Sequence, residues 1–313
     1  MKFLLKLISG LIVMVLLVSA GLVAATWEPD RSVEALSERW AQPPSQFINV
    51  NGQAVHLRDE GPRNDPLPVV LLHGTSASLH TWNGWTAELS KTRRVIRFDL
   101  PGFGLTGPTP AGDYSLEAYV QFVADVMNTL GVERYVLGGN SLGGSIAWRT
   151  AAAYPQRVEK LILVDSGGYP FKAESWPIAF LISQTPVLNQ IMEYTLPRSA
   201  VEASVKDVYG DPSRVTAELV DRYFDLSLRS GNRAALRERF AQLEYDDKSA
   251  LVRSLQQPTL VLWGDQDHLI PTSVAKRFEE DLHHGTLIMF AGLGHVPHEE
   301  DPATTVAAVM KFL

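Results

Sequence analysis

Short apolar segments alternate with helical patterns along most of this chain, and this alternation limits the folds open to it. Near-continuous apolar runs occupy residues 69–72, 95–98, 135–137, 161–164, 260–263 and 287–290. Helical patterns lie between and after them, at residues 116–130, 142–154, 273–282 and 303–313. Strands that are apolar throughout are typical of a parallel sheet covered on both faces. The sequence therefore predicts an α/β fold with a mainly parallel sheet flanked by helices.

Two further strands precede these runs. Residues 47–50 and 54–58 are separated by Asn51-Gly52, a pair that supplies the positive φ angles of a two-residue hairpin turn. This leading hairpin brings the predicted sheet to eight strands. We expect the core domain to comprise residues 46–166 and 259–313.

The alternation is interrupted between residues 167 and 258. This segment lacks strand patterns and is rich in helix-forming residues from position 201 to position 255. It is too long for a structureless loop inside a compact domain. We predict a helical lid over residues 167–258, inserted after the sixth strand and covering the C-terminal edge of the sheet.

The first 26 residues differ from the rest of the chain. Lys2 and Lys6 precede an uncharged, mostly apolar run over residues 7–26, and Glu28 and Asp30 follow it. About 20 helical residues can cross a bilayer core of roughly 30 Å, and this charge order favours an exported body. We predict that residues 1–26 form an anchor, held in the lipid bilayer through residues 7–26, and that residues 27–45 form a linker.

Two other interpretations of this N-terminal segment stay open. Val18-Ser19-Ala20 or Val23-Ala24-Ala25 could serve as the small-residue site of a cleaved signal peptide. The mature protein would then be secreted or periplasmic. The segment could also be a buried helix of the globular domain.

Composition excludes several classes of function. The formal net charge is −7 at pH 7, and no Lys/Arg cluster offers a surface for nucleic acid. The chain has no cysteine, which excludes disulfides, thiol catalysis and cysteine-ligated metals. No cofactor is expected, and the sequence does not determine an oligomeric state.

A G-x-S-x-G pentad at residues 139–143 lies between a strand pattern and a helix pattern. A serine hydroxyl becomes a useful nucleophile when a tight turn holds it exposed beside a base. Glycines suit the flanking positions because a β-carbon there would collide with neighbouring backbone. Ser141 is therefore a candidate nucleophile.

Candidate partners of Ser141 follow two later strands. Asp265 and Asp267 come directly after residues 260–263, and His295 comes shortly after residues 287–290. In an open α/β sheet, ligands bind beyond the carboxyl ends of the strands. A serine, a carboxylate and a histidine thus emerge there in an order that differs from those of the other serine-triad folds. His298 follows closely, but no third residue at helical spacing completes a metal site with His295.

Together with His73-Gly74 and the turn from Asp99 to Gly104, these motifs resemble the α/β-hydrolase superfamily, in its branch with a helical lid. The resemblance covers about residues 46–313. It implies that Ser141 is the nucleophile, that His295 is the base, and that Asp267 rather than Asp265 is the triad acid. It also implies an oxyanion hole formed by the backbone N–H groups of Thr75 and Leu142.

The resemblance also narrows the chemistry. Haloalkane dehalogenases and epoxide hydrolases carry aspartate where this chain has Ser141. The Gly-Asn-Ser-x-Gly-Gly motif that contains Asn140 is similar to that of the carbon–carbon bond hydrolases that cleave ring-fission products. Those enzymes, however, usually have a Gly-rich stretch after His-Gly and a tryptophan where this chain has Val296. We therefore predict a hydrolase of small to medium, apolar carboxylic esters that acts through an acyl-enzyme. The alternatives are a carbon–carbon bond hydrolase and a ligand receptor of the same fold.

The roles of some other residues are open in the sequence. Val296 and Trp82 are candidates to line the pocket, with core packing an equal alternative for Trp82. Arg233 or Arg237 of the lid could bind a substrate carboxylate, or both could be surface arginines. His56 is expected to be solvated. A further prediction is that Asp99, His73 and His298 are structural.

Overall fold

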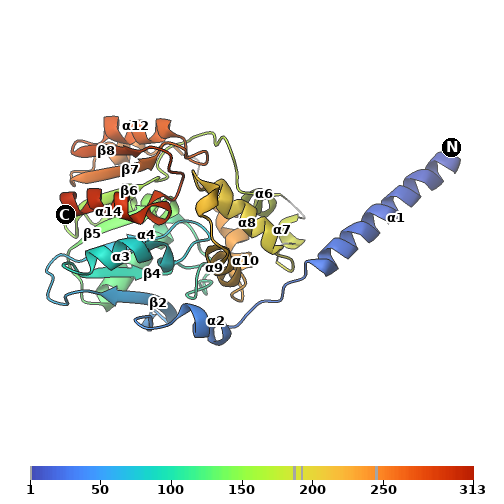
Figure 1. The fold of residues 1–313 in the computed structure, drawn as a ribbon, viewed down its shortest axis with the longest axis horizontal. Helices are drawn as coiled ribbons and strands as arrows, with labels where there is room; N and C mark the ends of the chain where they lie inside the picture. The colour runs from blue at the N-terminus through green and yellow to red at the C-terminus, as the bar shows by residue number, and fades with distance from the viewer. Residues whose placement is uncertain (1, 186–187, 192, 244–245) are drawn as a thin grey trace.

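The computed structural model describes residues 2–185, 188–191, 193–243 and 246–313. One eight-stranded sheet runs in the order β1-β2-β4-β3-β5-β6-β7-β8 (Figure 1). Its strands are β1 (Gln46–Val50), β2 (Gln53–Glu60), β3 (Val69–Leu72), β4 (Val95–Phe98), β5 (Tyr135–Asn140), β6 (Val158–Val164), β7 (Thr259–Gly264) and β8 (Gly285–Phe290). β3 to β8 pair in parallel, whereas β1 pairs antiparallel with β2, and β2 antiparallel with β4. The predicted mainly parallel sheet with a leading hairpin is confirmed.

Alternate residues of the central strands face opposite sides of the sheet, as the two-residue period of a strand requires. One face packs against helices α4 (Leu116–Thr129), α5 (Leu142–Ala153) and α12 (Thr272–Asp281), and its strand residues include Val70, Leu72, Leu137, Leu161, Leu163, Val261 and Trp263. The other face packs against α3 (Asn83–Leu89) and α14 (Pro302–Phe312), and its strand residues include Val69, Leu71, Val136, Ile162, Val164, Leu260 and Leu262. Burial on both faces is the reason that these strands are apolar throughout.

The segment between β6 and β7 is helical. It contains α6 (Ile178–Gln184), α7 (Leu188–Ile191), α8 (Arg198–Asp207), η2 (Pro212–Arg214), α9 (Ala217–Ser227), α10 (Asn232–Ala241) and α11 (Ser249–Arg253). Figure 1 shows α6 to α10 gathered at one end of the sheet. α8 and α9 share a small apolar core with Val296 from the loop after β8. The structure thus has the helical cap after the sixth strand that the sequence predicts.

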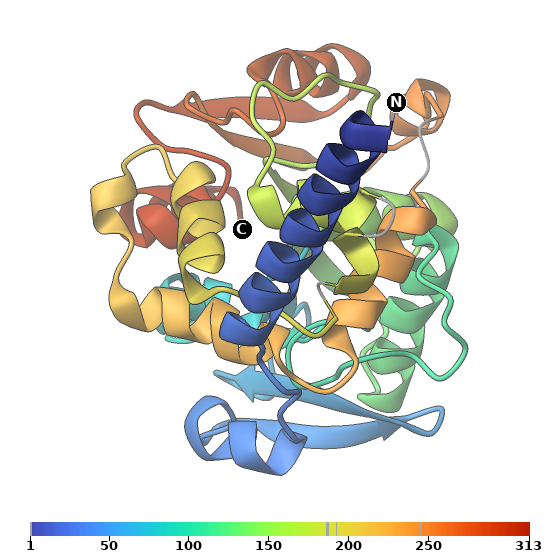
Figure 2. The same cartoon turned by 90° about the vertical axis from the view of Figure 1, so that its right-hand side faces the viewer.

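Helix α1 (Lys2–Ala25) extends away from the body on the side of the lid (Figures 1 and 2). Among the residues that the structure describes, no helix combines the length and the apolar character needed to cross a membrane. The side chains of residues 2–5, 11, 12, 15, 16, 19 and 22 lie outside the described part of this helix. The structure therefore does not support the anchor over residues 7–26, which stays a prediction.

The segment predicted as a linker, residues 27–45, contains a helix of its own. In α2 (Val33–Trp40), the Ser32 hydroxyl accepts a hydrogen bond from the Ala35 N–H and caps the N-terminus. Leu36 and Trp40 lie one turn apart and pack against Leu105 and Leu226 of the body. This segment is therefore packed onto the globular domain over part of its length.

His56 is fully buried, so the expectation that it is solvated is wrong. Its Nδ1 donates to Asp99 Oδ2 at 2.7 Å, and the other Asp99 oxygen accepts from the Leu79 N–H at 2.7 Å. Asp99 Oδ2 also accepts from the Leu105 N–H at 2.8 Å. Asp99 therefore ties the turn after β4 to the turn (η1, Leu79–Trp82) that follows the 73–78 loop.

We expect Asp99→Ala to lower the free energy of unfolding by about 3–5 kcal/mol, because it leaves buried donors without their acceptor. Burial raises the pKa of Asp99, but His56, His73 and His80 outweigh it, and the net pKa lies far below the ordinary value. The stabilisation is therefore complete above about pH 4 and declines at more acidic pH. Chemical denaturation measures it, with Asp113→Ala, which removes an exposed carboxylate, as the control. Equal effects of the two substitutions would contradict the assigned role.

Candidate active site

Ser141 lies at the sharp turn between β5 and α5. Its φ of 54° is in the left-handed region, which side chains other than glycine rarely adopt. A β-carbon at position 139 would lie 2.2 Å from the Gly143 carbonyl oxygen. A β-carbon at position 143 would lie 2.3 Å from the Leu72 carbonyl oxygen. Both glycines are therefore needed for the backbone to pack this tightly, and the packing holds Ser141 above the end of the sheet.

The loop after β3 passes directly beside Ser141. A β-carbon at Gly74 would lie 3.2 Å from the Ser141 β-carbon, so Thr75 follows at the closest approach of the two segments. Leu142 is the first residue of α5, where a backbone N–H has no acceptor within the helix. The two N–H groups predicted for the oxyanion hole thus belong to the two segments that flank Ser141.

His295 and Asp267 form a buried hydrogen-bonded pair. His295 Nδ1 donates to Asp267 Oδ2 at 2.7 Å, and Asp267 Oδ1 accepts from the N–H groups of Leu269 and Ile270 at 2.9 Å each. Asp265 instead accepts from the Gly292 N–H at 2.7 Å on an exposed loop. The geometry therefore pairs His295 with Asp267 and not with Asp265.

The loop that carries His295 is held on both sides. The His295 N–H donates to the Val208 carbonyl oxygen at 2.8 Å, and the His295 carbonyl oxygen accepts from Asn140 Nδ2 at 2.9 Å. Asn140, one residue before Ser141, thereby connects the turn at Ser141 to the loop that carries His295. Among the described residues there is no hydrogen bond between Ser141 and the His295 ring, and such bonds often form only when substrate is bound.

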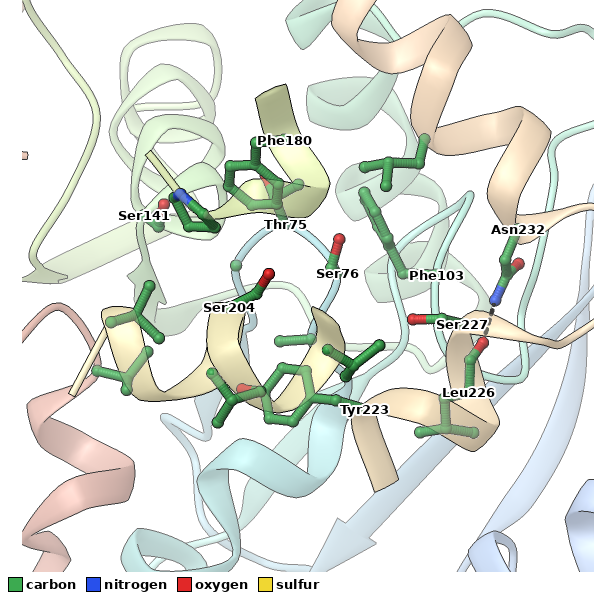
Figure 3. Close-up of a pocket in the computed structure, with 18 of the residues that line it drawn as sticks. Thr75, Ser76, Phe103, Ser141, Phe180, Ser204, Tyr223, Leu226, Ser227 and Asn232 are labelled. Carbon is green, nitrogen blue, oxygen red and sulfur yellow. Dashed lines mark hydrogen bonds between the residues drawn. The ribbon is translucent and has the colours of Figure 1, made fainter. Parts of the chain in front are cut away.

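Ser141 and His295 line one pocket of about 110 Å³ beneath the lid. In Figure 3, Phe103, Phe180 and Tyr223 surround this pocket, with Ser76 and Ser204 near its middle. Ser141 also borders a second cavity of about 240 Å³. Residues that line this second cavity but not the first include Trp148, Arg149, Phe171, Trp176, Arg239 and Phe240. Space therefore extends from the serine in two directions.

The other residues predicted to line the pocket differ in their positions. Val296 and Thr75 line the first pocket, as predicted for Val296. Trp82 does not: its ring is fully buried against those of Trp85 and His298, with centroids 4.9 and 4.0 Å away. Trp82 is therefore a core residue, because the η1 turn directs its ring into the layer between the sheet and α14.

The two lid arginines also differ. Arg233 lines the first pocket and is only 4% exposed, so it is not a surface arginine. Arg237 lies one turn further along α10 and pairs with Glu193 and Glu238. Arg237 borders a different cavity, which shares none of its described lining residues with the first pocket.

Asp165 is a site residue that the sequence analysis missed. It follows β6, is fully buried, and has a φ of 42°. Its carboxyl group accepts a hydrogen bond from the Gly264 N–H at 3.0 Å. Asp165 also lies close to Asp267 and His295: one carboxylate oxygen of each aspartate and one ring nitrogen of His295 all lie within 4.8 Å of one another. The same test that found Asp267, a polar residue directly after a strand, would have found Asp165.

The environment of Asp165 favours the protonated form of its carboxyl group. Burial raises the pKa of Asp165 well above its ordinary value, and Asp267 raises it further, while the hydrogen bond from Gly264 lowers it. A neutral Asp165 leaves the carboxyl pair with one negative charge rather than two, and its hydroxyl can donate toward Asp267. We assign the three groups to a hydrogen-bonded cluster rather than to a metal site, because both Asp267 oxygens and His295 Nδ1 already have partners.

We expect Asp165→Asn to stabilise the protein at neutral pH and to flatten the pH dependence of its stability. A carboxyl group with a raised pKa in the folded state favours folding most below its unfolded pKa of about 4 and loses that contribution as pH rises toward the folded value. Asparagine keeps an acceptor for Gly264 and a donor toward Asp267 without titrating. Denaturation curves across a pH series measure the slope. An unchanged slope, or a loss of stability at neutral pH, would contradict this account.

Comparison with known proteins places this geometry in a family. A 2-hydroxy-6-oxo-2,4-heptadienoate hydrolase of Pseudomonas putida is 29% identical, over 86% of this chain and 95% of its own. The crystal structure of a membrane phospholipase A, described as a bacterial virulence factor, matches 99% of this chain and 97% of its own with 26% identity and a TM-score of 0.74. A thermophilic esterase from Thermogutta terrifontis matches 86% of this chain and 97% of its own with 26% identity and a TM-score of 0.70.

The model of the alpha/beta hydrolase fold family matches residues 68–302, which include Ser141, Asp267 and His295. The match extends from just before β3 to the first residue of α14 and includes the whole lid. Both the sequence and the strand order agree with it. The chain belongs to the α/β-hydrolase family.

Proposed function

We propose that this protein is a serine hydrolase that cleaves small to medium carboxylic esters through an acyl-enzyme intermediate. The observation that carries the proposal is the strained Ser141 turn, which opens into the same pocket as a His295 ring already bonded to Asp267. A serine needs such a base, and the base needs a carboxylate that fixes its tautomer.

In the proposed reaction, Ser141 Oγ attacks the ester carbonyl carbon while His295 Nε2 takes the hydroxyl proton. The negative charge that develops on the carbonyl oxygen is stabilised by the N–H groups of Thr75 and Leu142, each worth about 3 kcal/mol of barrier. His295 returns the proton to the leaving alcohol, and the acyl group stays on Ser141. Water then attacks the acyl carbon as His295 takes its proton, the bond to Ser141 Oγ breaks to release the acid, and His295 passes the proton to Oγ. Asp267 stabilises the imidazolium in both steps.

The sizes of the two cavities support a substrate whose acyl and alcohol parts are both small to medium in size. The first pocket, at about 110 Å³, is several times larger than the roughly 10–15 Å³ that a single water molecule needs. Apolar side chains dominate its lining, including Phe103, Phe180, Val201 and Leu236. The second cavity also borders Ser141 and is lined by Trp148 and Trp176. An ester bond held at Ser141 would direct its acyl and alcohol parts into these two spaces.

Carbon–carbon bond hydrolysis is a second candidate, favoured by the similarity to the Pseudomonas putida hydrolase and by Asn140. Val296, where those enzymes usually have tryptophan, supports the ester reaction instead. Turnover of matched aryl esters and of a 2-hydroxy-6-oxo-dienoate distinguishes the two. A kcat/KM for the dienoate above that for every ester would transfer the proposal to carbon–carbon hydrolysis.

We expect Ser141→Ala to abolish labelling by a fluorophosphonate probe and to lower kcat by several orders of magnitude, on the order of 10⁶. Ser145→Ala is the matched control, because Ser145 lies one turn along the same helix and bonds the Ser141 carbonyl oxygen through its hydroxyl. It should label at nearly the native rate. Equal labelling of native protein and Ser141→Ala would exclude Ser141 as the nucleophile.

We also propose that residues 7–26 attach an exported catalytic domain to a membrane. Support comes from the uncharged run between Lys6 and Glu28, and from the similarity to a membrane phospholipase A over 99% of this chain. No described helix has the properties of a membrane span, so the proposal rests on the sequence and on that similarity.

We expect the full-length chain in the membrane fraction, and a variant without residues 2–26 in the soluble fraction. Immunoblotting of both fractions measures the distribution, and fluorophosphonate labelling of the shortened variant checks that it is folded. A native product that is shortened and soluble would instead indicate a cleaved signal peptide.

A further inference from the structure

The pocket beneath the lid has a polar end opposite Ser141. In Figure 3, Ser227 and Asn232 lie across the pocket from Ser141, beyond Ser76 and Phe103. Asn232 begins α10, and its Nδ2 donates to the carbonyl oxygens of Gly104 and Leu226 at 3.0 and 2.8 Å. These bonds fix the start of α10, so the next residue, Arg233, has a defined position at this end of the pocket.

Arg233 is a buried cation with unused donors. Its Nη2 donates to the Glu28 carbonyl oxygen at 2.8 Å and to Asp30 Oδ1 at 2.7 Å. Its Nε and Nη1 are buried and have no partner among the described residues. A buried donor without an acceptor is costly, and a hydrogen bond from a guanidinium group to a carboxylate is charge-assisted. Arg233 therefore has donors available for an acceptor that the described residues do not supply.

The charges around the pocket favour an anion at this position. Among the described residues, those that line the pocket include no aspartate or glutamate. Asp30 contacts Arg233 from outside that lining, and the Asp30 side chain is 41% exposed. Among the described residues that line this pocket, Arg233 is the only arginine or lysine. Arg222 and Arg237 do not line it, and they pair with Glu299 and with Glu193 and Glu238, respectively. Arg233 is thus the cation that an anionic group in this pocket would meet.

We propose that Arg233 binds a carboxylate carried by the substrate at the end remote from the scissile carbonyl. The substrate class is then an ester whose acyl or alcohol part ends in a carboxylate, with an apolar chain between the two groups. The apolar side chains that line the pocket, such as Phe103 and Leu236, accommodate the chain, and Arg233 sets its preferred length. This assignment rests on the proposed function for the position of the scissile bond at Ser141.

The test compares carboxylate-ended and methyl-ended substrates of equal chain length. Two series serve: 4-nitrophenyl monoesters of α,ω-diacids, and acetate esters of ω-hydroxy acids. At the length that spans the pocket, Arg233→Met should lower kcat/KM for the carboxylate-ended ester of one series roughly 10- to 100-fold, the value of a charge-assisted hydrogen bond. The methyl-ended partner should change little. An equal effect on both partners at every length, in both series, would overturn the proposal.

Matched variants separate recognition from folding. Arg237→Met removes an arginine from the same helix but from outside this pocket, and it should leave the ratio of the two kcat/KM values unchanged. Asp30→Asn removes the negative charge that pairs with Arg233 and leaves the Glu28 carbonyl oxygen to hold the guanidinium in place. If Arg233 only holds residues 28–30 onto the lid, Asp30→Asn and Arg233→Met will lower stability alike and neither will alter the ratio, which would overturn the proposal. Arg233→Lys, which keeps the positive charge but not the guanidinium geometry, should restore part of the preference if Arg233→Met fails to fold.

A binding measurement keeps this inference apart from the proposed function. In Ser141→Ala, thermal stabilisation by the α,ω-diacid monoesters does not depend on turnover. Stabilisation that disappears in Ser141→Ala/Arg233→Met supports the carboxylate site even if no ester is hydrolysed by the native protein, a result that would contradict only the proposed function. Stabilisation unaffected by Arg233→Met would overturn the carboxylate site and leave ester hydrolysis standing.

Discussion

The close packing of backbone around Ser141 is the constraint on which the rest of the site depends. The end of β3, the end of β5 and the first turn of α5 approach so closely that positions 139 and 143 have no room for a β-carbon. The left-handed φ of Ser141 is unfavourable by itself, on the order of 1–3 kcal/mol, and the surrounding sheet maintains it. The same packing brings the loop at Gly74 and the free N–H groups of α5 to one side of the serine. A single crowded turn thus positions both Ser141, the proposed nucleophile, and the N–H groups proposed to stabilise the charge that its attack would create.

The strand ends supply the remaining groups of the site from three neighbouring strands. β6 is followed by Asp165, β7 by Asp267, and β8 by His295. Two carboxyl groups this close cannot both be charged without a large penalty in a buried environment. Holding the proton on Asp165 lets Asp267 serve His295 while Asp165 keeps the Gly264 backbone in place. Which of the two carboxyl groups carries the proton therefore depends on the neighbouring groups as much as on its own hydrogen bonds.

The fold could be predicted from the sequence because its strands are buried on both faces and its turns carry specific residues. Asn51-Gly52, the glycines around Ser141 and the polar residues after strands each have a local physical cause that one sequence displays. Trp82 and His56 could not be assigned in that way, since burial depends on which layer a side chain enters. Arg233 was ambiguous for the same reason: a helical position does not show which face of α10 meets the pocket. The catalytic roles of Ser141, Asp267 and His295 remain predictions, although the structure brings His295 and Asp267 into contact and both His295 and Ser141 to one pocket.

The contacts of Arg233 connect the pocket to the N-terminal segment. Residues 27–31 lie against the lid: Trp27 stacks on Tyr194 with ring centroids 5.4 Å apart, and Arg31 pairs with Asp225 at 2.7 Å. The Arg31 N–H donates to Leu228, and Ser230 donates back to Arg31. Glu28 and Asp30 therefore reach Arg233 from a segment that is fixed to α9 and to the start of α10. If residues 7–26 attach the protein to a membrane, the first residues after that attachment are the ones that hold the guanidinium group at the end of the pocket. Attachment and substrate preference would then share one structural element, because any displacement of residues 28–30 changes the partners left to Arg233.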